Sequence, residues 1–215
     1  MIQEGYKPLS RSMGYLLLKV PQDILNEIKI SVDEIQSDFT KAIPHNQNLA
    51  GQIDKEYATQ LTNKAAQYIK HAVEQYCEFN PTYIQEIYGQ FHVTPKLKYE
   101  GRTWINFQEK YEYNPLHNHN GIFSYVIWYQ IPFFKEDEVK YGAGKYKPRE
   151  HPNHNGNFSF MYYDGEYILE EPLSVDKTGE GYMAVFPSSL MHQVYPFYTS
   201  DDYRITISGN VFLQG

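Results

Sequence analysis

Two histidines separated by one residue are the clearest chemistry-bearing feature of this sequence. His117 and His119 lie in the segment Asn-Pro-Leu-His-Asn-His-Asn-Gly, shortly before an apolar run that begins at Phe123. In an extended backbone, side chains at positions i and i+2 point to the same side, so both imidazoles can reach one point. Imidazole suits iron, zinc, copper and nickel. The spacing favours a metal site, and it is also compatible with two solvated loop histidines.

A third histidine occurs further along the chain, after a strongly apolar segment. His192 follows the residues 182–186 and a Pro-Ser turn that begins at Pro187. A histidine at the start of a strand that returns toward the His117 region could complete a set of three imidazoles. Three neutral ligands of this kind are a known arrangement for a catalytic metal.

One arginine follows this histidine in a pattern that favours anion binding. Arg204 alternates with Ile205 and Ile207, so Arg204, Thr206 and Ser208 share one face of a strand. A guanidinium fork can grip both oxygens of a carboxylate, and the hydroxyls add two more donors. The alternative interpretation is an arginine that points from the strand into solvent.

These residues need a scaffold, and the chain after residue 90 predicts one made of short β-strands. Apolar and aromatic runs alternate there with Gly, Pro, Asn and Asp, which is typical of a sandwich or barrel. Asp164-Gly165 predicts a hairpin turn, and the polar stretch 135–157 predicts a long loop. The predicted strands are 96–99, 103–108, 123–131, 158–163, 182–186, 192–195 and 204–212.

The first 90 residues have a different pattern, with apolar residues spaced three and four apart. After a strand at 15–20, this spacing predicts a helix from Pro21 to about Ile35, a second helix over 54–76 and a shorter one over 82–88. Helices that bury one stripe need a partner, and the strands offer the only one. We therefore predict a single domain over 1–215, with supporting elements in 1–90 and a β core in 91–215.

Composition excludes several classes of protein. The 215 residues include 19 basic and 26 acidic ones, a formal net charge of −7, which argues against a nucleic-acid partner. The longest aliphatic run, 16–18, is far too short to span a membrane, and no signal peptide is evident. The single cysteine, Cys77, cannot form an internal disulfide, so we expect a reducing, cytoplasmic location.

The order of these motifs resembles that of the Fe(II)/2-oxoglutarate-dependent oxygenases. That superfamily shows H-x-[D/E], then a distal histidine, then Arg or Lys about ten residues later. Here the corresponding residues are His117, His119, His192 and Arg204.

The resemblance is closer to a subgroup encoded by tailed phages of marine cyanobacteria. Similar segments are 48–53, 114–119, Phe186-Pro187 before the distal histidine, and 204–210, so the similarity covers roughly residues 45 to 212. It implies a mainly β fold with α elements, a double-stranded β-helix (jelly-roll) with supporting N-terminal helices.

The resemblance also implies cofactors and the residues that hold them. Fe(II) would be bound by His117, His119 and His192. The distal carboxylate of 2-oxoglutarate would pair with Arg204, helped by Thr206 or Ser208. Side chains from neighbouring strands would add hydrogen bonds to this co-substrate, and the candidates are Asn106 and Tyr129.

One position departs from the superfamily, because His119 stands where a carboxylate is usual. Three interpretations follow. In the first, all three histidines hold the metal. In the second, His119 and His192 hold it, and Gly121 leaves a vacancy for an anion. In the third, the site holds metal weakly or not at all and is inactive.

The implied activity is that of a hydroxylase that acts on a small molecule or a protein residue. We expect no membrane partner. Two other functions remain open at this point. Three histidines and a water suit a zinc hydrolase, although that function leaves Arg204 unexplained. A jelly-roll could also be a non-catalytic binding module, whose tyrosine-rich wall would suit sugar rings.

Overall fold

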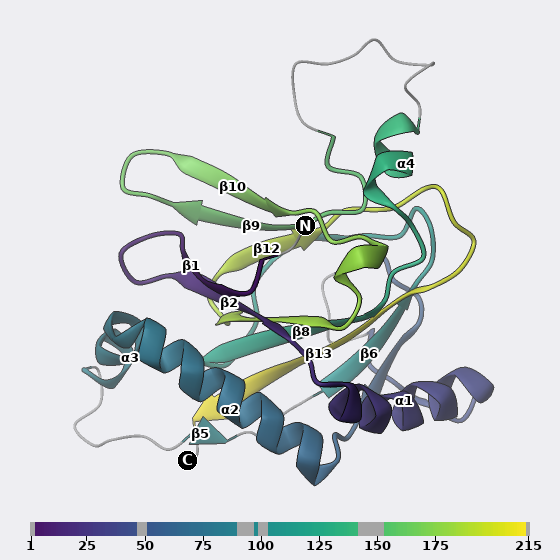
Figure 1. The fold of residues 1–215 in the computed structure, drawn as a ribbon, viewed down its shortest axis with the longest axis horizontal. Coiled ribbons are helices and arrows are strands. Elements are labelled where there is room, and N and C mark those ends of the chain that lie inside the picture. The colour runs from purple at the N-terminus through teal and green to yellow at the C-terminus, as the bar shows by residue number, and fades with distance from the viewer. Residues whose placement is uncertain (1–2, 47–50, 90–96, 99–102, 142–152, 214–215) are drawn as a thin grey trace.

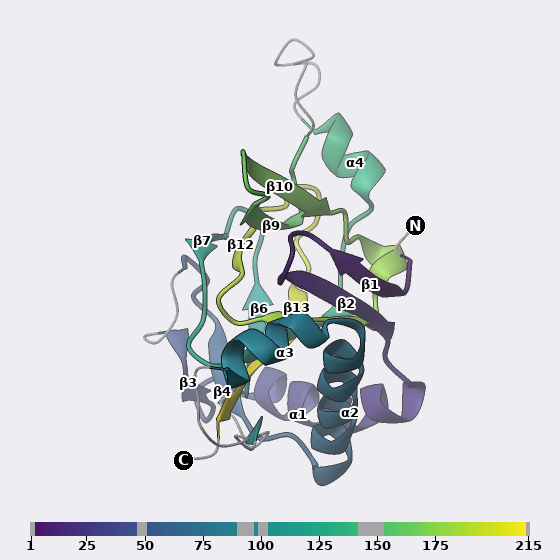
Figure 2. The ribbon, with the colours of Figure 1, turned by 90° about the vertical axis from the view of Figure 1, so that its left-hand side faces the viewer.

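The protein is built in three layers, two β-sheets and a layer of helices (Figures 1 and 2). The computed structural model describes residues 3–46, 51–89, 97–98, 103–141 and 153–213. A nine-stranded sheet lies in the middle, with a four-stranded sheet on one side and the helices on the other. Every strand pairing is antiparallel, which confirms the mainly β architecture with N-terminal helices. The order of the layers places the chemistry between the two sheets.

The larger sheet contains the predicted strand that begins at Arg204. This strand, β13, pairs with β6 on one side and with β8 on the other, and β5 (Leu97–Lys98) pairs with its far end. The strands of the main path, in spatial order, are β1 (Gly5–Pro8), β2 (Gly14–Lys19), β11 (Tyr182–Pro187), β8 (Phe123–Gln130), β13 (Arg204–Leu213), β6 (Thr103–Gln108), β4 (Glu56–Thr59) and β3 (Ile43–Pro44).

The smaller sheet brings together two of the three histidines. Its register places His192 of β12 directly opposite His117 of β7. Strand β7 was not expected from the sequence, because it is short and contains a proline, whereas β10 is the second strand of the hairpin predicted at Asp164-Gly165. The strands in spatial order are β10 (Ile168–Leu173), β9 (Phe158–Tyr163), β12 (Met191–Val194) and β7 (Asn114–His117).

Helices cover the outer face of the larger sheet. They are α1 (Gln22–Ser37), α2 (Asn63–Phe79) and α3 (Pro81–Tyr88). The apolar stripe of α1 (Ile24, Ile28 and Val32) is buried in one hydrophobic cluster with outer-face residues of the sheet such as Ile207. Burying an aliphatic side chain of this size contributes about 1.5–3 kcal/mol. This shared core fixes which face of β13 is apolar, and it turns Arg204 toward the other sheet.

A second hydrophobic cluster fills the space between the sheets. The rings of Phe158, Phe160 and Phe186 pack there, and each lies close to the imidazole of His192. Phe158 stacks on that imidazole with ring centroids 5.4 Å apart. Aromatic packing of this kind fixes the histidine ring in one orientation.

Two predicted elements were wrong in their boundaries. The helix predicted over 54–76 starts only at Asn63, because 56–59 form β4 and the Thr62 side chain accepts a hydrogen bond from the backbone N–H of Ala65, which caps the helix. The loop predicted over 135–157 contains a short helix, α4 (Lys135–Lys140). A 3₁₀ helix over Lys177–Gly179 is also present. The predicted strand 96–99 is described only at β5, since Lys96 and Tyr99 lie outside the described residues.

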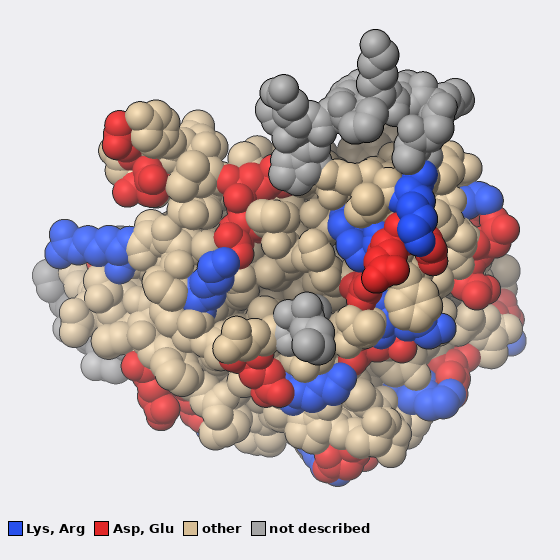
Figure 3. Space-filling model, turned by 45° about the horizontal axis from the view of Figure 1, so that its top comes forward, with Lys and Arg blue, Asp and Glu red and all other residues tan. Residues whose placement is uncertain are grey.

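The surface carries charges of both signs in mixture. On the face drawn in Figure 3, lysine and arginine side chains are interspersed with aspartate and glutamate. This mixture gives that face no broad basic area of the kind that binds nucleic acid. Within the described ranges, none of the helices has the length and apolar character that crossing a bilayer requires.

Candidate functional site

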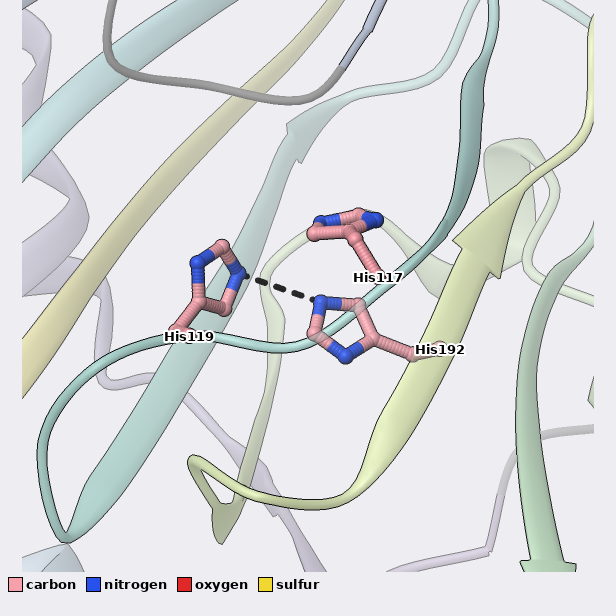
Figure 4. A group of neighbouring side chains, drawn as sticks. All are labelled: His117, His119 and His192. Atoms are coloured by element: carbon pink, nitrogen blue, oxygen red, sulfur yellow. Dashed lines mark hydrogen bonds between the residues drawn. The ribbon is translucent and has the colours of Figure 1, made fainter.

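Three histidines meet at one point between the sheets (Figure 4). One ring nitrogen from each of His117, His119 and His192 lies within 4.8 Å of the others. The Nε2 atoms of His192 and His119 are 3.1 Å apart. Within the described part of the chain, this is the one group of three or more His, Cys, Asp or Glu side chains placed for a metal ion, and no carboxylate belongs to it.

The backbone sets the orientation of two of these rings. Nδ1 of His117 donates to the carbonyl of Pro115 at 2.6 Å, and Nδ1 of His192 donates to the carbonyl of Leu190 at 2.9 Å. A carbonyl can only accept, so the proton sits on Nδ1 and the lone pair sits on Nε2, facing the common point. This is the tautomer that a metal bound through Nε2 needs.

Burial keeps all three imidazoles uncharged. It lowers the pKa of His117, and it lowers the pKa of His119 to about 4 with a smaller contribution from the neighbouring His117. Burial and the two other histidines hold the pKa of His192 well below its ordinary value. Three neutral rings whose nitrogens converge fit a divalent metal ion, because metal binding requires deprotonated imidazole.

Gly121 lies in the turn after His119, where the backbone requires a glycine. Its φ is +125°, a conformation that favours glycine. A side chain there would place Cβ 2.9 Å from the carbonyl oxygen of Val211 and 3.3 Å from Oγ of Ser188. The glycine therefore serves the backbone conformation of this turn.

The predicted anion-binding strand lines the same cavity as the histidines. A cavity of about 50 Å³ is bounded by His117, His119 and His192 and by side chains of β13 and β6. Asn106 Nδ2 donates to Oγ1 of Thr206 at 2.9 Å, so the hydroxyl proton of Thr206 is free for another acceptor. The predicted residues brought to this wall are Arg204, Thr206, Ser208 and Asn106.

The Arg204 guanidinium is buried and held by neutral groups. Nε and Nη2 both donate to Oε1 of Gln108, at 2.8 and 2.6 Å. Nη1 donates to the carbonyl of Gly156 at 2.8 Å, and Nη2 also donates to the carbonyl of Tyr195 at 3.0 Å. These bonds use four of the five N–H groups of an arginine. Burial lowers the pKa of Arg204 to about 9, and the nearby Glu138 raises it.

Helix α4 fixes the two loops that supply these carbonyls. The ammonium of Lys135 donates to the carbonyls of Asn153 and Asn155 and to the side chain of Asn157, around Gly156. Glu138 is fully buried, and its carboxylate accepts from the backbone N–H groups of residues 198 and 199. One turn of helix therefore anchors both segments that hold Arg204.

A buried carboxyl lies behind the wall of the cavity. Glu56 of β4 pairs in register with Asn106, and Asn114 hydrogen bonds to its side chain. Burial, and to a smaller extent the charge of Glu112, raises the pKa of Glu56 to about 8. This carboxyl is therefore mostly protonated at neutral pH, so it adds little negative charge to the wall around Arg204.

The structure does not bring Tyr129 to the cavity. Tyr129 packs against the helix-side hydrophobic cluster, where Lys29 and Asp33 of α1 are its charged neighbours. Alternation along β8 explains this, because Trp128 lines the cavity and the adjacent Tyr129 lies on the opposite face of the strand. Gln108 also lines this cavity and was not predicted as a site residue. The same alternation could have found it, since Gln108 follows Asn106 by two residues on β6.

Solved structures with the same fold are oxygenases. A prolyl-4-hydroxylase from Pseudomonas putida matches with 14% identity and a TM-score of 0.54, over 95% of each chain. A Trichoplax adhaerens prolyl hydroxylase, solved with a hypoxia inducible factor peptide, matches with 10% identity and a TM-score of 0.52, over 93% of this chain and 82% of that chain. These likenesses confirm the double-stranded β-helix. Among curated proteins, none matches the chain.

Comparison of the sequence with a family model also indicates an oxygenase. The family described as "Putative 2OG-Fe(II) oxygenase" matches residues 102–210, which is half of the chain and includes all three histidines and Arg204. Its members use Fe(II) and 2-oxoglutarate, and the histidine group and the buried arginine share one cavity here. The chain therefore belongs to the 2OG-Fe(II) oxygenase family and is a 2-oxoglutarate-dependent dioxygenase.

Proposed function

We propose that the protein is a hydroxylase that binds Fe(II) through His117, His119 and His192 and 2-oxoglutarate through Arg204. The observation that carries this proposal is a buried cation whose hydrogen-bond partners are all neutral, in the same cavity as three converging imidazoles. A buried charge is normally paired, so an unpaired arginine in a cavity indicates an anionic ligand. A zinc hydrolase would leave this arginine without a role.

The histidines fit ferrous iron as a set of neutral ligands. When bound, the iron supplies the activation of dioxygen, so that one oxygen atom enters a substrate C–H bond and the other enters succinate as 2-oxoglutarate loses CO₂. The protein's own part is to hold three Nε2 lone pairs at one point and to keep water out with the rings of Phe158 and Phe186.

The wall of β13 and β6 would hold the distal carboxylate of 2-oxoglutarate. Arg204 has one Nη1 N–H beyond the four that bond to the protein, and Thr206 has a free hydroxyl proton. Together they offer a charge-assisted donor and a neutral donor on the same face of β13. Asn106 orients Thr206, and Ser208 lies further along the strand toward the histidines.

Succinate release tests this proposal without knowledge of the substrate. We expect the purified protein, with Fe(II), oxygen and 2-oxoglutarate, to release succinate slowly. Arg204→Ala should raise the KM for 2-oxoglutarate by at least about 10- to 100-fold, because a hydrogen bond to a charged group contributes about 1.5–3 kcal/mol. The exposed Arg11 provides the matched control, Arg11→Ala. Unchanged KM in Arg204→Ala would remove Arg204 from this role.

The substrate belongs to this proposal as well, as a small molecule or a protein residue. The Trichoplax adhaerens enzyme is described with a peptide bound, which supports a protein residue as one candidate. The similarity to phage-encoded oxygenases supports a phage origin and a location in host cytoplasm. The core that α1 and α2 share with β13 supports a single domain over the whole chain.

A further inference from the structure

The charge of Arg204 meets no carboxylate in the described part of the protein. Every ion pair there joins a lysine or histidine to an acid, and none involves Arg204. Glu138 is the acid with an electrostatic effect on Arg204. Its carboxylate oxygens accept hydrogen bonds from the N–H groups of Tyr198 and Thr199 and from the Thr199 hydroxyl. The positive charge is therefore buried without a counter-ion.

A neutral amide occupies the place where a counter-ion would sit. Oε1 of Gln108 accepts from both Nε and Nη2, which is the edge of the guanidinium that a carboxylate commonly grips. Gln108 lies directly opposite Arg204 in the register of β6 and β13 and is 2% exposed. The most accessible binding edge of Arg204 is thus already taken by the protein.

The orientation of this amide is fixed by a second contact. Nε2 of Gln108 donates to the carbonyl of Glu112 at 2.6 Å. A flipped amide would place its NH₂ group against the guanidinium and its oxygen against a carbonyl, so two favourable contacts would become two unfavourable ones. Gln108 therefore holds the guanidinium in one rotational state, beside the stacked rings of Phe133 and Phe197.

We propose that Gln108 is the positioning residue that sets co-substrate specificity. Its neutral oxygen fixes the guanidinium so that the remaining Nη1 N–H faces the cavity, and it leaves the charge of Arg204 available to the distal carboxylate of a 2-oxo dicarboxylic acid. A glutamate of the same length would still offer an acceptor to Nε and Nη2, but its charge would neutralise that of Arg204, and it would lose the hydrogen bond to the Glu112 carbonyl. This inference rests on the proposed role of Arg204.

Gln108→Glu separates position from charge. The test measures the Kd of the Mn(II)-loaded protein for 2-oxoglutarate and for 2-oxopentanoate, which has the same chain length but no distal carboxylate, by calorimetry. In Gln108→Glu we expect about 10- to 100-fold weaker binding of 2-oxoglutarate, with 2-oxopentanoate within about 3-fold of the wild type. The preference for the dicarboxylic acid should therefore collapse, whereas a merely structural defect would weaken both ligands alike.

Two further variants keep the result interpretable. Gln108→Met removes the acceptor without adding charge, so 2-oxoglutarate should bind about 3- to 10-fold more weakly while its preference over 2-oxopentanoate persists. Gln130→Glu is the matched control, because the Gln130 amide donates to the carbonyl of Tyr203, next to Arg204, and does not contact the guanidinium. It should keep the preference.

Each outcome decides a different point. If Gln108→Glu keeps the wild-type preference while Arg204→Ala loses it, the inference about Gln108 is wrong and the proposed function stands. If Arg204→Ala also keeps the preference, the proposed co-substrate site itself is wrong. If Gln108→Glu fails to fold, Gln108→Met decides: weaker binding of 2-oxoglutarate with a retained preference would support the inference, and either unchanged binding or loss of the preference would overturn it.

Discussion

The two ends of the cavity are held in opposite ways. At the histidine end, His117 and His192 are each fixed by the carbonyl of the residue two positions earlier, Pro115 and Leu190. At the arginine end, Arg204 is fixed by groups from three other parts of the chain. The first arrangement is local in sequence, and the second depends entirely on the tertiary fold.

This difference in anchoring matches a difference in the role of the two ends. Local anchors hold His117 and His192 so that one ring nitrogen of each histidine lies within 4.8 Å of the others, as a metal site requires. The remote anchors of Arg204 use four N–H groups and hold the guanidinium beside two stacked rings, Phe133 and Phe197. The arginine end is therefore preorganised, and a charged ligand can bind there with little reorganisation.

The largest expected effect comes from breaking the histidine end. His119→Ala should lower affinity for Fe(II) by more than about 100-fold, because it removes a ligand and not only an orienting contact, which alone typically costs 10- to 100-fold. Iron content after anaerobic loading measures this. His71→Ala, on an exposed face of α2 where His71 contacts Gln75, should keep the wild-type content. Full iron occupancy in His119→Ala would overturn the three-histidine site.

A smaller effect should follow from loosening the arginine end at a distance. Glu138→Gln replaces one acceptor oxygen by a donor that faces backbone N–H groups, so the segment 195–199 should shift and weaken the hold on Arg204. We expect the free energy of unfolding to fall by about 1–3 kcal/mol, measured by urea denaturation, and the KM for 2-oxoglutarate to rise by about 3- to 10-fold.

Glu136→Gln, on the exposed side of the same helix, is the control for this variant and should change neither quantity. An unchanged KM in Glu138→Gln, despite lower stability, would show that the loops hold Arg204 without help from α4.

The wall between the two ends predicts a pH dependence of stability. The pKa of Glu56 is raised to about 8 in the folded protein, so the folded state disfavours the ionised carboxylate. Stability from this group is therefore greatest at pH values below its ordinary pKa and declines as the pH rises toward 8. Glu56→Gln should unfold with a free energy about 1–3 kcal/mol higher than the wild type at pH 8.5, and similar to it at pH 4.5.

Thermal or urea unfolding at several pH values measures this difference. The exposed Glu166, in the turn between β9 and β10, supplies the control variant Glu166→Gln, which should follow the wild type. A difference between Glu56→Gln and wild type that stays constant with pH would contradict the raised pKa.

The smallest effect is expected on the helix side of the larger sheet. Tyr129→Phe should change the Kd for 2-oxoglutarate by less than about 2-fold, because Tyr129 packs toward α1 and not toward the cavity. Asn106→Ala, from the cavity face, should weaken binding by about 10-fold in the same calorimetric titration. Equal effects of the two substitutions would mean that the two faces of this sheet are not functionally distinct.

The contrast between the two ends also explains which parts of the site could be predicted from the sequence. His117, His119 and the alternation of Arg204 with two isoleucines are local patterns, so the sequence predicted them and the β core around them. The partners of Arg204 lie 96, 48 and 9 residues away, and no local pattern marks a backbone carbonyl as a ligand. The strands β4 and β7 were missed for the same reason, since pairing with distant strands stabilises such short segments.

Arg204 and two of the histidines lie on different sheets, and this placement affects how long the folded protein persists. Hydrogen bonds join the strands within each sheet, and the two sheets form separate ladders. A dicarboxylic acid that contacts Arg204 on one sheet and reaches the histidines on the other acts as a removable cross-link between the ladders. By mass action, its concentration then raises the resistance of the chain to opening and to proteolysis. The abundance of a common metabolite would thus help to set how long each molecule survives.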